Sequence, residues 1–321
     1  MKPRRLLAAA IAVVGCVASS PGPLKLFYPY KAANFSYGQG SEAGSEALSV
    51  FPPEGSAVKV NVPFHLGHVV FGPHGKSIYA TNAVIQDGIL REQTGLSKIE
   101  FNPIRSSPVA GTAAFHIKSF VVSLREDKVA ISVNHQDRQG IPCGIFEILL
   151  PTGNVRQVLK SDCHDMWAWD KLSLSPDGTQ AIATVGSNTD RDLHLELIDV
   201  VRGTTKPIHG DYWVGAWSPD GKWIAVLGNR NRDLSLIDPQ DFSRRRSLGS
   251  TTSIMPAWSP DSRYLLLWKY RRFRCGFFLD IEPPGTLETL DIASGKRSAV
   301  QSSECRLDNG PTGWVSSEIA R

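Results

Sequence analysis

A short segment recurs along this chain at nearly constant spacing. Leu174-Ser175-Pro176-Asp177-Gly178 returns as Trp217-Ser218-Pro219-Asp220-Gly221 and as Trp258-Ser259-Pro260-Asp261-Ser262, with starts 43 and 41 residues apart. Phe71-Gly72-Pro73-His74-Gly75 is an earlier version. Proline fixes φ and Asp-Gly reverses the chain, so each segment predicts a tight turn after a strand. Repeats of about 40–45 residues built from short strands are typical of the blades of a β-propeller.

The same succession of strands is expected after each turn. An apolar run comes first, then a polar loop, an alternating strand that ends near Asp or Asn, and an outer strand. The alternating strands are predicted at Leu193–Asp199, Leu234–Asp238 and Leu287–Asp291, with Ile99–Asn102 as a weaker version. We therefore expect four antiparallel strands, A to D, in each repeat.

Two further blades are expected to complete the ring. Leu124–Lys128 lies about halfway across the 103 residues between His74 and Asp177 and predicts another repeat. The chain ends predict a sixth blade, with strands B, C, D and A at Tyr30–Tyr37, Ala47–Phe51, Val58–Val62 and Gly313–Ile319. Pairing of the N- and C-terminal strands would remove a free sheet edge. The expected fold class is all-β: a single-domain β-propeller over residues 31–321, with six blades of four antiparallel strands.

The repeat resembles that of the TolB-like, WD-repeat-like six-bladed propellers. Their repeat runs aromatic-Ser-Pro-Asp-Gly-Lys, an apolar strand, then a strand closing in Asp, as in Trp217–Lys222 and its continuation. The resemblance covers roughly residues 64–300 and is weaker in the first two blades. TolB itself carries an extra α/β domain before its propeller, and too few residues precede the first blade here to hold one. This departure argues against a role in the Tol system.

The first residues predict export from a bacterial cell. Met1–Arg5 is basic and Leu6–Val14 is short and apolar, so residues 1–15 read as a signal peptide. Val13-Val14-Gly15-Cys16 resembles the bacterial lipobox, which implies lipidation at Cys16 and a tether over residues 16–30. Ordinary cleavage, for instance after Ala18, is the alternative. The protein is expected to be periplasmic or an outer-membrane lipoprotein.

The charge balance bears on the class of partner. The leader contributes three cations and no acid, so its removal lowers the formal net charge from +4 to +1. A nearly neutral protein argues against nucleic-acid binding, which usually needs a strong basic excess. The expected partner is a protein or an envelope glycan, the expected membrane contact a lipid anchor, and the expected oligomeric state a monomer.

The four remaining cysteines fit two disulfides within blades. Cys143 and Cys163 flank strands C and D of the second blade, and Cys275 and Cys305 take similar places in the fifth. Each bridge would contribute about 3 kcal/mol in the loop-closure model. A four-cysteine metal site, the alternative, would need close spacing that is absent.

Histidines gather in the loops that lead into strand A. The blade register places five of them there: His65, His68, His116, His164 and His209. Converging imidazoles can bind a divalent metal or act as acid and base, and His65, His116, His164 and His209 are the candidate ligands. Oligogalacturonate lyases, a TolB-like family, build a manganese site from histidines in this way, although no local motif carries their residues over. The alternative is solvated loop histidines and no cofactor.

Basic and aromatic residues are expected on the same upper face. The predicted anion-binding or partner-binding residues in the B–C loops are Arg230, Arg232, Lys269, Arg271, Arg272 and Arg274. The alternative is solvated loops whose cations pair with acids such as Asp190, Asp192 or Asp233. The channel mouth or the core would hold Trp167, Trp169 and Trp213, and packing between blades is predicted for Trp217, Trp258 and Trp314. Arg244–Arg246 is interpreted as charge that blunts an exposed sheet edge.

The motifs of common catalysts are missing. The chain has no Gly-x-Ser-x-Gly and no helical zinc motif. The sequence therefore favours an exported, non-catalytic propeller that engages a partner protein or envelope glycan through its upper-face loops. A metal-assisted lyase or hydrolase acting on an acidic saccharide or similar anion at the central channel is the alternative, with the histidines as ligands and the arginines as clamp. A purely structural lipoprotein is a third possibility.

Overall fold

In the computed structural model the chain folds into a ring of β-sheets. The structure describes residues 30–36, 46–51, 58–62, 66–86, 89–101, 103–133, 140, 142–161, 170–186, 193–229, 232–251, 256–270, 285–303 and 312–316. Residues 1–29, with the predicted signal peptide, Cys16 and nearly all of the tether, lie outside these ranges. Within them, no helix is long and apolar enough to cross a membrane.

The described strands form six four-stranded antiparallel sheets, and five of these use consecutive strands. Blade 1 holds β4 (Leu66–Phe71), β5 (Ser77–Gln86), β6 (Ile89–Phe101) and β7 (Ile104–Pro108). Blade 2 holds β8 (Ser119–Val122), β9 (Lys128–Val133), β10 (Gly144–Leu149) and β11 (Asn154–Lys160). Blade 3 holds β12 (Asp170–Leu174), β13 (Gln180–Val185), β14 (His194–Asp199) and β15 (Thr204–Ile208). Blade 4 holds β16 (Tyr212–Trp217), β17 (Ile224–Gly228), β18 (Asp233–Ile237) and β19 (Arg245–Ser250), and blade 5 holds β20 (Ala257–Trp258), β21 (Tyr264–Tyr270), β22 (Gly285–Asp291) and β23 (Arg297–Ser303).

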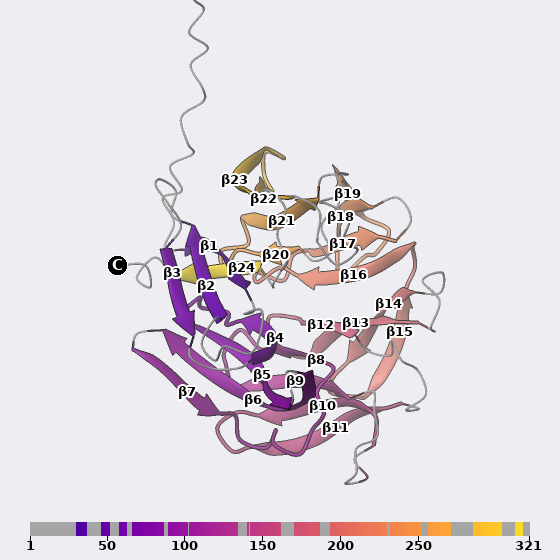
Figure 1. Ribbon diagram of the computed structural model, residues 1–321. Helices are drawn as coiled ribbons and strands as arrows, with labels where there is room; N and C mark the ends of the chain where they lie inside the picture. Colours follow the sequence, from indigo (N-terminus) through magenta and orange to yellow (C-terminus); the bar gives the residue numbers. More distant parts are fainter. Residues whose placement is uncertain are drawn as a thin grey trace, which may run out of the picture.

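The sixth sheet joins the two ends of the described chain. Its strand order is β24 (Thr312–Ser316), β1 (Tyr30–Ser36), β2 (Glu46–Phe51) and β3 (Val58–Val62). Strand β24 runs antiparallel to β1, with Ala32 opposite Trp314. Figure 1 shows the yellow β24 beside the indigo β1 to β3. The predicted pairing of N- and C-terminal strands is therefore present.

One strand from each sheet faces a common centre. A cavity of about 280 Å³ lies there. Its lining includes one apolar residue from the first strand of each blade in turn: Phe71, Val122, Leu174, Trp217, Trp258 and Trp314. In Figure 1 the sheets surround this centre. The β-propeller expected from the repeat is the observed fold.

The repeated segment forms a turn held by its serine. In blade 3, Ser175 Oγ donates to Asp177 Oδ1 (2.6 Å) and accepts from the backbone N–H of Gln180 (2.9 Å). The equivalent bonds recur around Ser218 and Ser259. The hydroxyl of Ser175 is the main reason why the pKa of Asp177 lies below its ordinary value. The serine therefore ties the turn to the start of the next strand.

The same turn survives in blade 2 without proline or glycine. Ser123 Oγ donates to Asp127 and accepts from the backbone N–H of Lys128. Glu126 takes φ 50° at the place where Gly178 takes φ 69°. The left-handed conformation costs an L-residue roughly 1–2 kcal/mol, and the surrounding bonds hold it there. The hidden repeat predicted at Leu124–Lys128 is thus confirmed.

Blade 1 departs from the expected strand lengths. Strands β5 and β6 form one long hairpin that pairs Gln86 with Ile89 and Ser77 with Glu100. The weak strand predicted at Ile99–Asn102 is only the last part of β6. The prediction was short because polar residues such as Arg91 and Glu92 read as a loop, while the structure extends the pairing through them.

Tryptophans tie neighbouring inner strands together. Trp314 Nε1 donates to the carbonyl of Ala257 (3.1 Å), and Trp258 Nε1 donates to the carbonyl of Ala216 (2.9 Å). Each bond runs from one blade to the preceding one. The backbone N–H of Trp217 makes the next link, to Ser173 Oγ (2.9 Å). The predicted packing of these tryptophans between blades is confirmed.

A buried carboxylate joins blades 2 and 3 on the side of the repeated turns. Glu147 is 9% exposed and lies 3.0 Å from Lys128 Nζ and 2.9 Å from Arg156 Nη2. These two cations also donate to the carbonyls of Gly178 and Val200 in blade 3. Burial alone would raise the pKa of Glu147, but the hydrogen bonds from Arg156 and Lys128 outweigh it, and the pKa lies below its ordinary value.

Glu147→Gln should weaken the protein at neutral pH and flatten its acid sensitivity. A depressed folded-state pKa contributes stability above the unfolded pKa, and this stability is lost as pH falls through the folded value. We expect the free energy of unfolding at pH 7 to fall by about 1–3 kcal/mol, and the gap to the parent to narrow below pH 4. Urea unfolding at both pH values measures this. Parallel pH curves for the two proteins would contradict it.

Candidate functional site

The upper face carries the loops that connect strand D to A and strand B to C, opposite the repeated turns. Two of the four predicted metal ligands are described there. His116 is partly buried and forms an isolated backbone β-bridge with Thr94, and His209 is exposed. His65 and His164 lie outside the described residues. Among the residues that are described, no group of three or more His, Cys, Asp or Glu could hold a metal. The four-histidine site stays a prediction.

His68 was predicted in a loop and lies elsewhere. It is on strand β4, where it lines the central cavity and its ring centroid is 5.6 Å from that of Phe120. The prediction was wrong because the strand begins at Leu66, earlier than the repeat alone suggests. This histidine belongs to the packing of the channel.

Only some of the predicted cationic and aromatic residues lie within the described ranges. Arg232 and Trp213 are described with their side chains, and Lys269 is described as part of strand β21 without its side chain. The rest of the set lies outside the described residues: Arg230, Arg271, Arg272, Arg274, Trp167 and Trp169.

The structure brings Arg232 and Trp213 together and adds Lys171. Lys171 Nζ lies 3.8 Å from the centroid of the Trp213 ring, and Arg232 Cζ lies 5.1 Å from it. Both distances are within the range of cation–π attraction, which contributes about 0.5–1 kcal/mol at exposed sites. Lys171 comes from blade 3, and the other two residues come from blade 4. We call this group the cationic stack.

Both cations of the stack have unusual backbone geometry. Lys171 has φ 51° and Arg232 has φ 56°. Only four described non-glycine residues have positive φ, and the other two, Glu126 and Ser262, lie in the repeated turns. Strained backbone of this kind clusters at functional sites. The chain therefore tolerates strain at two positions that meet on one indole.

Backbone hydrogen bonds fix the surroundings of the stack. Thr184 Oγ1 donates to the carbonyl of Trp213 (2.5 Å). The N–H of Asn229 donates to the carbonyl of Asp211, and the N–H of Thr251 donates to the carbonyl of Arg232. The loops on either side of Trp213 are thus anchored to strands of blades 3 and 4. This makes the stack a preformed feature of the upper face.

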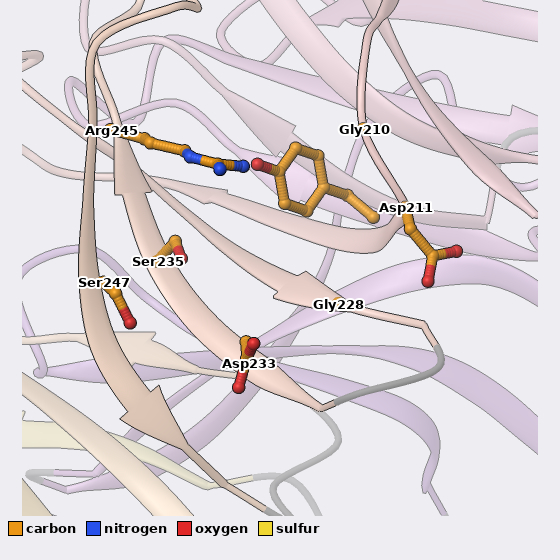
Figure 2. Close-up of a pocket in the computed structure, with 8 residues that line it drawn as sticks. Gly210, Asp211, Gly228, Asp233, Ser235, Arg245 and Ser247 are labelled. Atoms are coloured by element: carbon orange, nitrogen blue, oxygen red, sulfur yellow. The ribbon is translucent and has the colours of Figure 1, made fainter.

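A polar pocket of about 440 Å³ opens at the same end of blade 4 (Figure 2). Its lining is Gly210, Asp211, Tyr212, Gly228, Asp233, Ser235, Arg245 and Ser247. Sequence reasoning missed this site. The only available signal was the charged run Arg244–Arg246, which was interpreted as edge protection.

One predicted disulfide cysteine is described. Cys143 is buried and disulfide-bonded, and its carbonyl accepts hydrogen bonds from the N–H of Ser161 and from Gln157 Nε2. Cys163, Cys275 and Cys305 lie outside the described residues. The pairings Cys143–Cys163 and Cys275–Cys305 therefore stay predictions.

Comparison with known proteins identifies the fold. No family model and no curated protein matches the sequence. Among solved structures, TolB from Acinetobacter baumannii matches with a TM-score of 0.59 and 14% identity, over 89% of this chain and 66% of that chain. A putative TolB from Agrobacterium tumefaciens matches with a TM-score of 0.57 and 15% identity, over 86% and 90%. An oligogalacturonate lyase in complex with manganese matches with a TM-score of 0.51 and 14% identity, over 85% and 74%.

These likenesses show a TolB-like propeller fold. The chain covers just under two thirds of the Acinetobacter protein. At identities this low, a shared fold does not transfer a function, which has to be argued from the site itself.

The strain in the stack can be tested by two substitutions at one position. Arg232→Gly and Arg232→Ala remove the same cation, but only glycine takes φ 56° without a Cβ penalty. We expect the glycine variant to be about 1 kcal/mol more stable than the alanine variant in urea unfolding. An alanine variant as stable as the glycine one would show that the position is unstrained.

Proposed function

We propose that this protein is a non-catalytic binding propeller that holds an acidic group of its partner at the cationic stack on the upper face. The main support is that Lys171 of blade 3 and Arg232 of blade 4 both contact the ring of Trp213. The two strained cations are held in place by the fold, so their placement is pre-organised for an anion.

Electrostatics favours an acidic ligand at this place. Arg232 is exposed, and its guanidinium presents a planar fork that matches carboxylate or phosphate oxygens. Lys171 adds a second positive charge on the same indole. Two positive groups at one indole raise the local potential that attracts an anion.

The partner we propose is an acidic protein surface or an acidic envelope glycan in the periplasm. Export is supported by the basic start and the apolar run of residues 1–15, and anchoring by the lipobox-like Cys16. We also propose the pairing Cys143–Cys163, because Ser161, two residues before Cys163, already bonds to Cys143. That bridge would stiffen one upper loop.

The proposal is tested by binding of poly-L-glutamate and polygalacturonate, each followed by calorimetry at low and high salt. The parent should bind at least one of these polyanions, and salt should weaken the binding because the contacts are ionic. Arg232→Gln should weaken it roughly tenfold, since an ionic hydrogen bond contributes about 1.5–3 kcal/mol. Trp213→Leu should weaken it by a smaller factor, roughly two- to fivefold, because it removes cation–π contacts of about 0.5–1 kcal/mol that hold the two cations in place.

Arg105→Gln is the matched control. Arg105 is an exposed arginine on the outer strand β7 of blade 1, far along the ring from the stack. The control should bind like the parent. If neither polyanion binds at low salt, the proposal is contradicted. Cleavage of polygalacturonate with formation of unsaturated ends, dependent on added manganese, would instead favour the lyase alternative.

A further inference from the structure

The polar pocket of blade 4 has the volume of a ligand site and one rigid wall. Its volume of about 440 Å³ falls within the roughly 300–1,000 Å³ typical of small-molecule pockets. Gly210 closes one side: a Cβ at this position, at φ 144°, would lie 2.2 Å from Tyr212 Cε2. The backbone therefore packs directly on the tyrosine ring, which keeps that wall in place.

The lining groups share one face of the sheet. Ser235 and Ser247 are directly opposite each other on β18 and β19, and Arg245 is two residues before Ser247. Ile237, two residues after Ser235, packs in the core shared with blade 3. Side chains two residues apart in a strand point to the same side, so the pocket opens on the side of blade 4 that faces blade 3.

Figure 2 shows how these groups converge. Arg245 reaches from β19 across the sheet, and Ser247 lies on the same strand. Ser235 lies on the neighbouring strand β18, and Asp233 lies toward the other end of the pocket. Asp211 lies on the far wall, contributed by the loop between β15 and β16. The groups come from three separate segments of the chain and surround one space.

Several polar groups of the pocket have their bonding capacity unused. Ser235 is only 8% exposed, yet its hydroxyl makes no hydrogen bond with any described residue. Among the described residues, the exposed guanidinium of Arg245 has no ion pair, and the hydroxyl of the partly exposed Tyr212 has no hydrogen bond. Ser235 lines the pocket, so its hydroxyl can bond to a ligand there. The unused donors and acceptors point to a ligand.

The charges of the lining select the class of ligand. Two carboxylates, Asp211 and Asp233, and one guanidinium, Arg245, line the same pocket. The net charge of these three groups is −1, which disfavours an anion, and Arg245 repels a cation that would sit beside it. A neutral molecule with many hydroxyl groups meets neither penalty, because each hydroxyl both donates and accepts.

We propose that this pocket binds a neutral saccharide unit, with Arg245 and Ser235 bonding to its hydroxyl groups and Asp233 accepting from them. The pocket shares no lining residue with the cationic stack, although it lies beside it, and the proposal does not depend on the function assigned to the stack. An extended envelope glycan could occupy the pocket with a neutral sugar alone.

The test is binding of glucose, galactose, mannose, N-acetylglucosamine and their common disaccharides. Saturation-transfer NMR detects weak binding, and calorimetry measures the affinity of each hit. The parent should bind at least one neutral sugar. Arg245→Gln and Ser235→Val should each weaken binding roughly tenfold or more, the loss expected when one hydrogen bond of a bound ligand is removed.

The controls separate this site from folding and from the stack. Arg245 is exposed, so its variant should keep the melting temperature of the free protein, and Arg105→Gln should bind sugar like the parent. Trp213→Leu should weaken polyanion binding and keep sugar binding. The proposal is overturned if no neutral sugar binds, if Arg245→Gln and Ser235→Val both bind like the parent, or if galacturonate or free glutamate binds at this pocket in preference to neutral sugars.

Discussion

Closure of the ring is the constraint on which the rest of the structure depends. Strand β24 must leave blade 5 and pair with β1, near the other end of the described chain. The seam is tight: a Cβ on Gly313 would lie 2.3 Å from Phe71 Cγ, so blades 6 and 1 pack with no room to spare. With this seam closed, six inner strands surround one apolar cavity, and β1 is paired on both sides instead of being a free edge.

The fold could be predicted because its information is local and repeated. Ser175, Ser218 and Ser259 hold their turns with bonds to residues two and five positions on, so a short window of sequence contains the whole unit. The strands of blade 6 could be assigned because the repeat sets the order of the four strands within a blade. Blade 1 was less accurate, because its long hairpin is held by cross-strand pairing that composition does not reveal.

The site could be predicted only in part, for physical reasons. Arg232 and Trp213 were chosen by residue type and loop position, and the structure brings them together. Lys171 was not predicted from the sequence, because its role depends on its backbone φ of 51° and on a contact between two blades. Arg245, Ser235 and Tyr212 are ordinary strand residues in the sequence. They form a site only because the face of blade 4 that they share turns toward blade 3. Both candidate sites thus depend on how blades 3 and 4 are held in the ring.

Removal of strand β24 tests the closed ring most directly. A chain ending at residue 311 is compared with a control ending at residue 316, by urea unfolding followed through tryptophan fluorescence and circular dichroism. We predict that the control unfolds in one cooperative transition, while the shorter chain loses cooperative unfolding because two blade faces and the edge of β1 are exposed. A shorter chain with the midpoint and slope of the control would contradict the account, since the propeller would then stand without its closing strand.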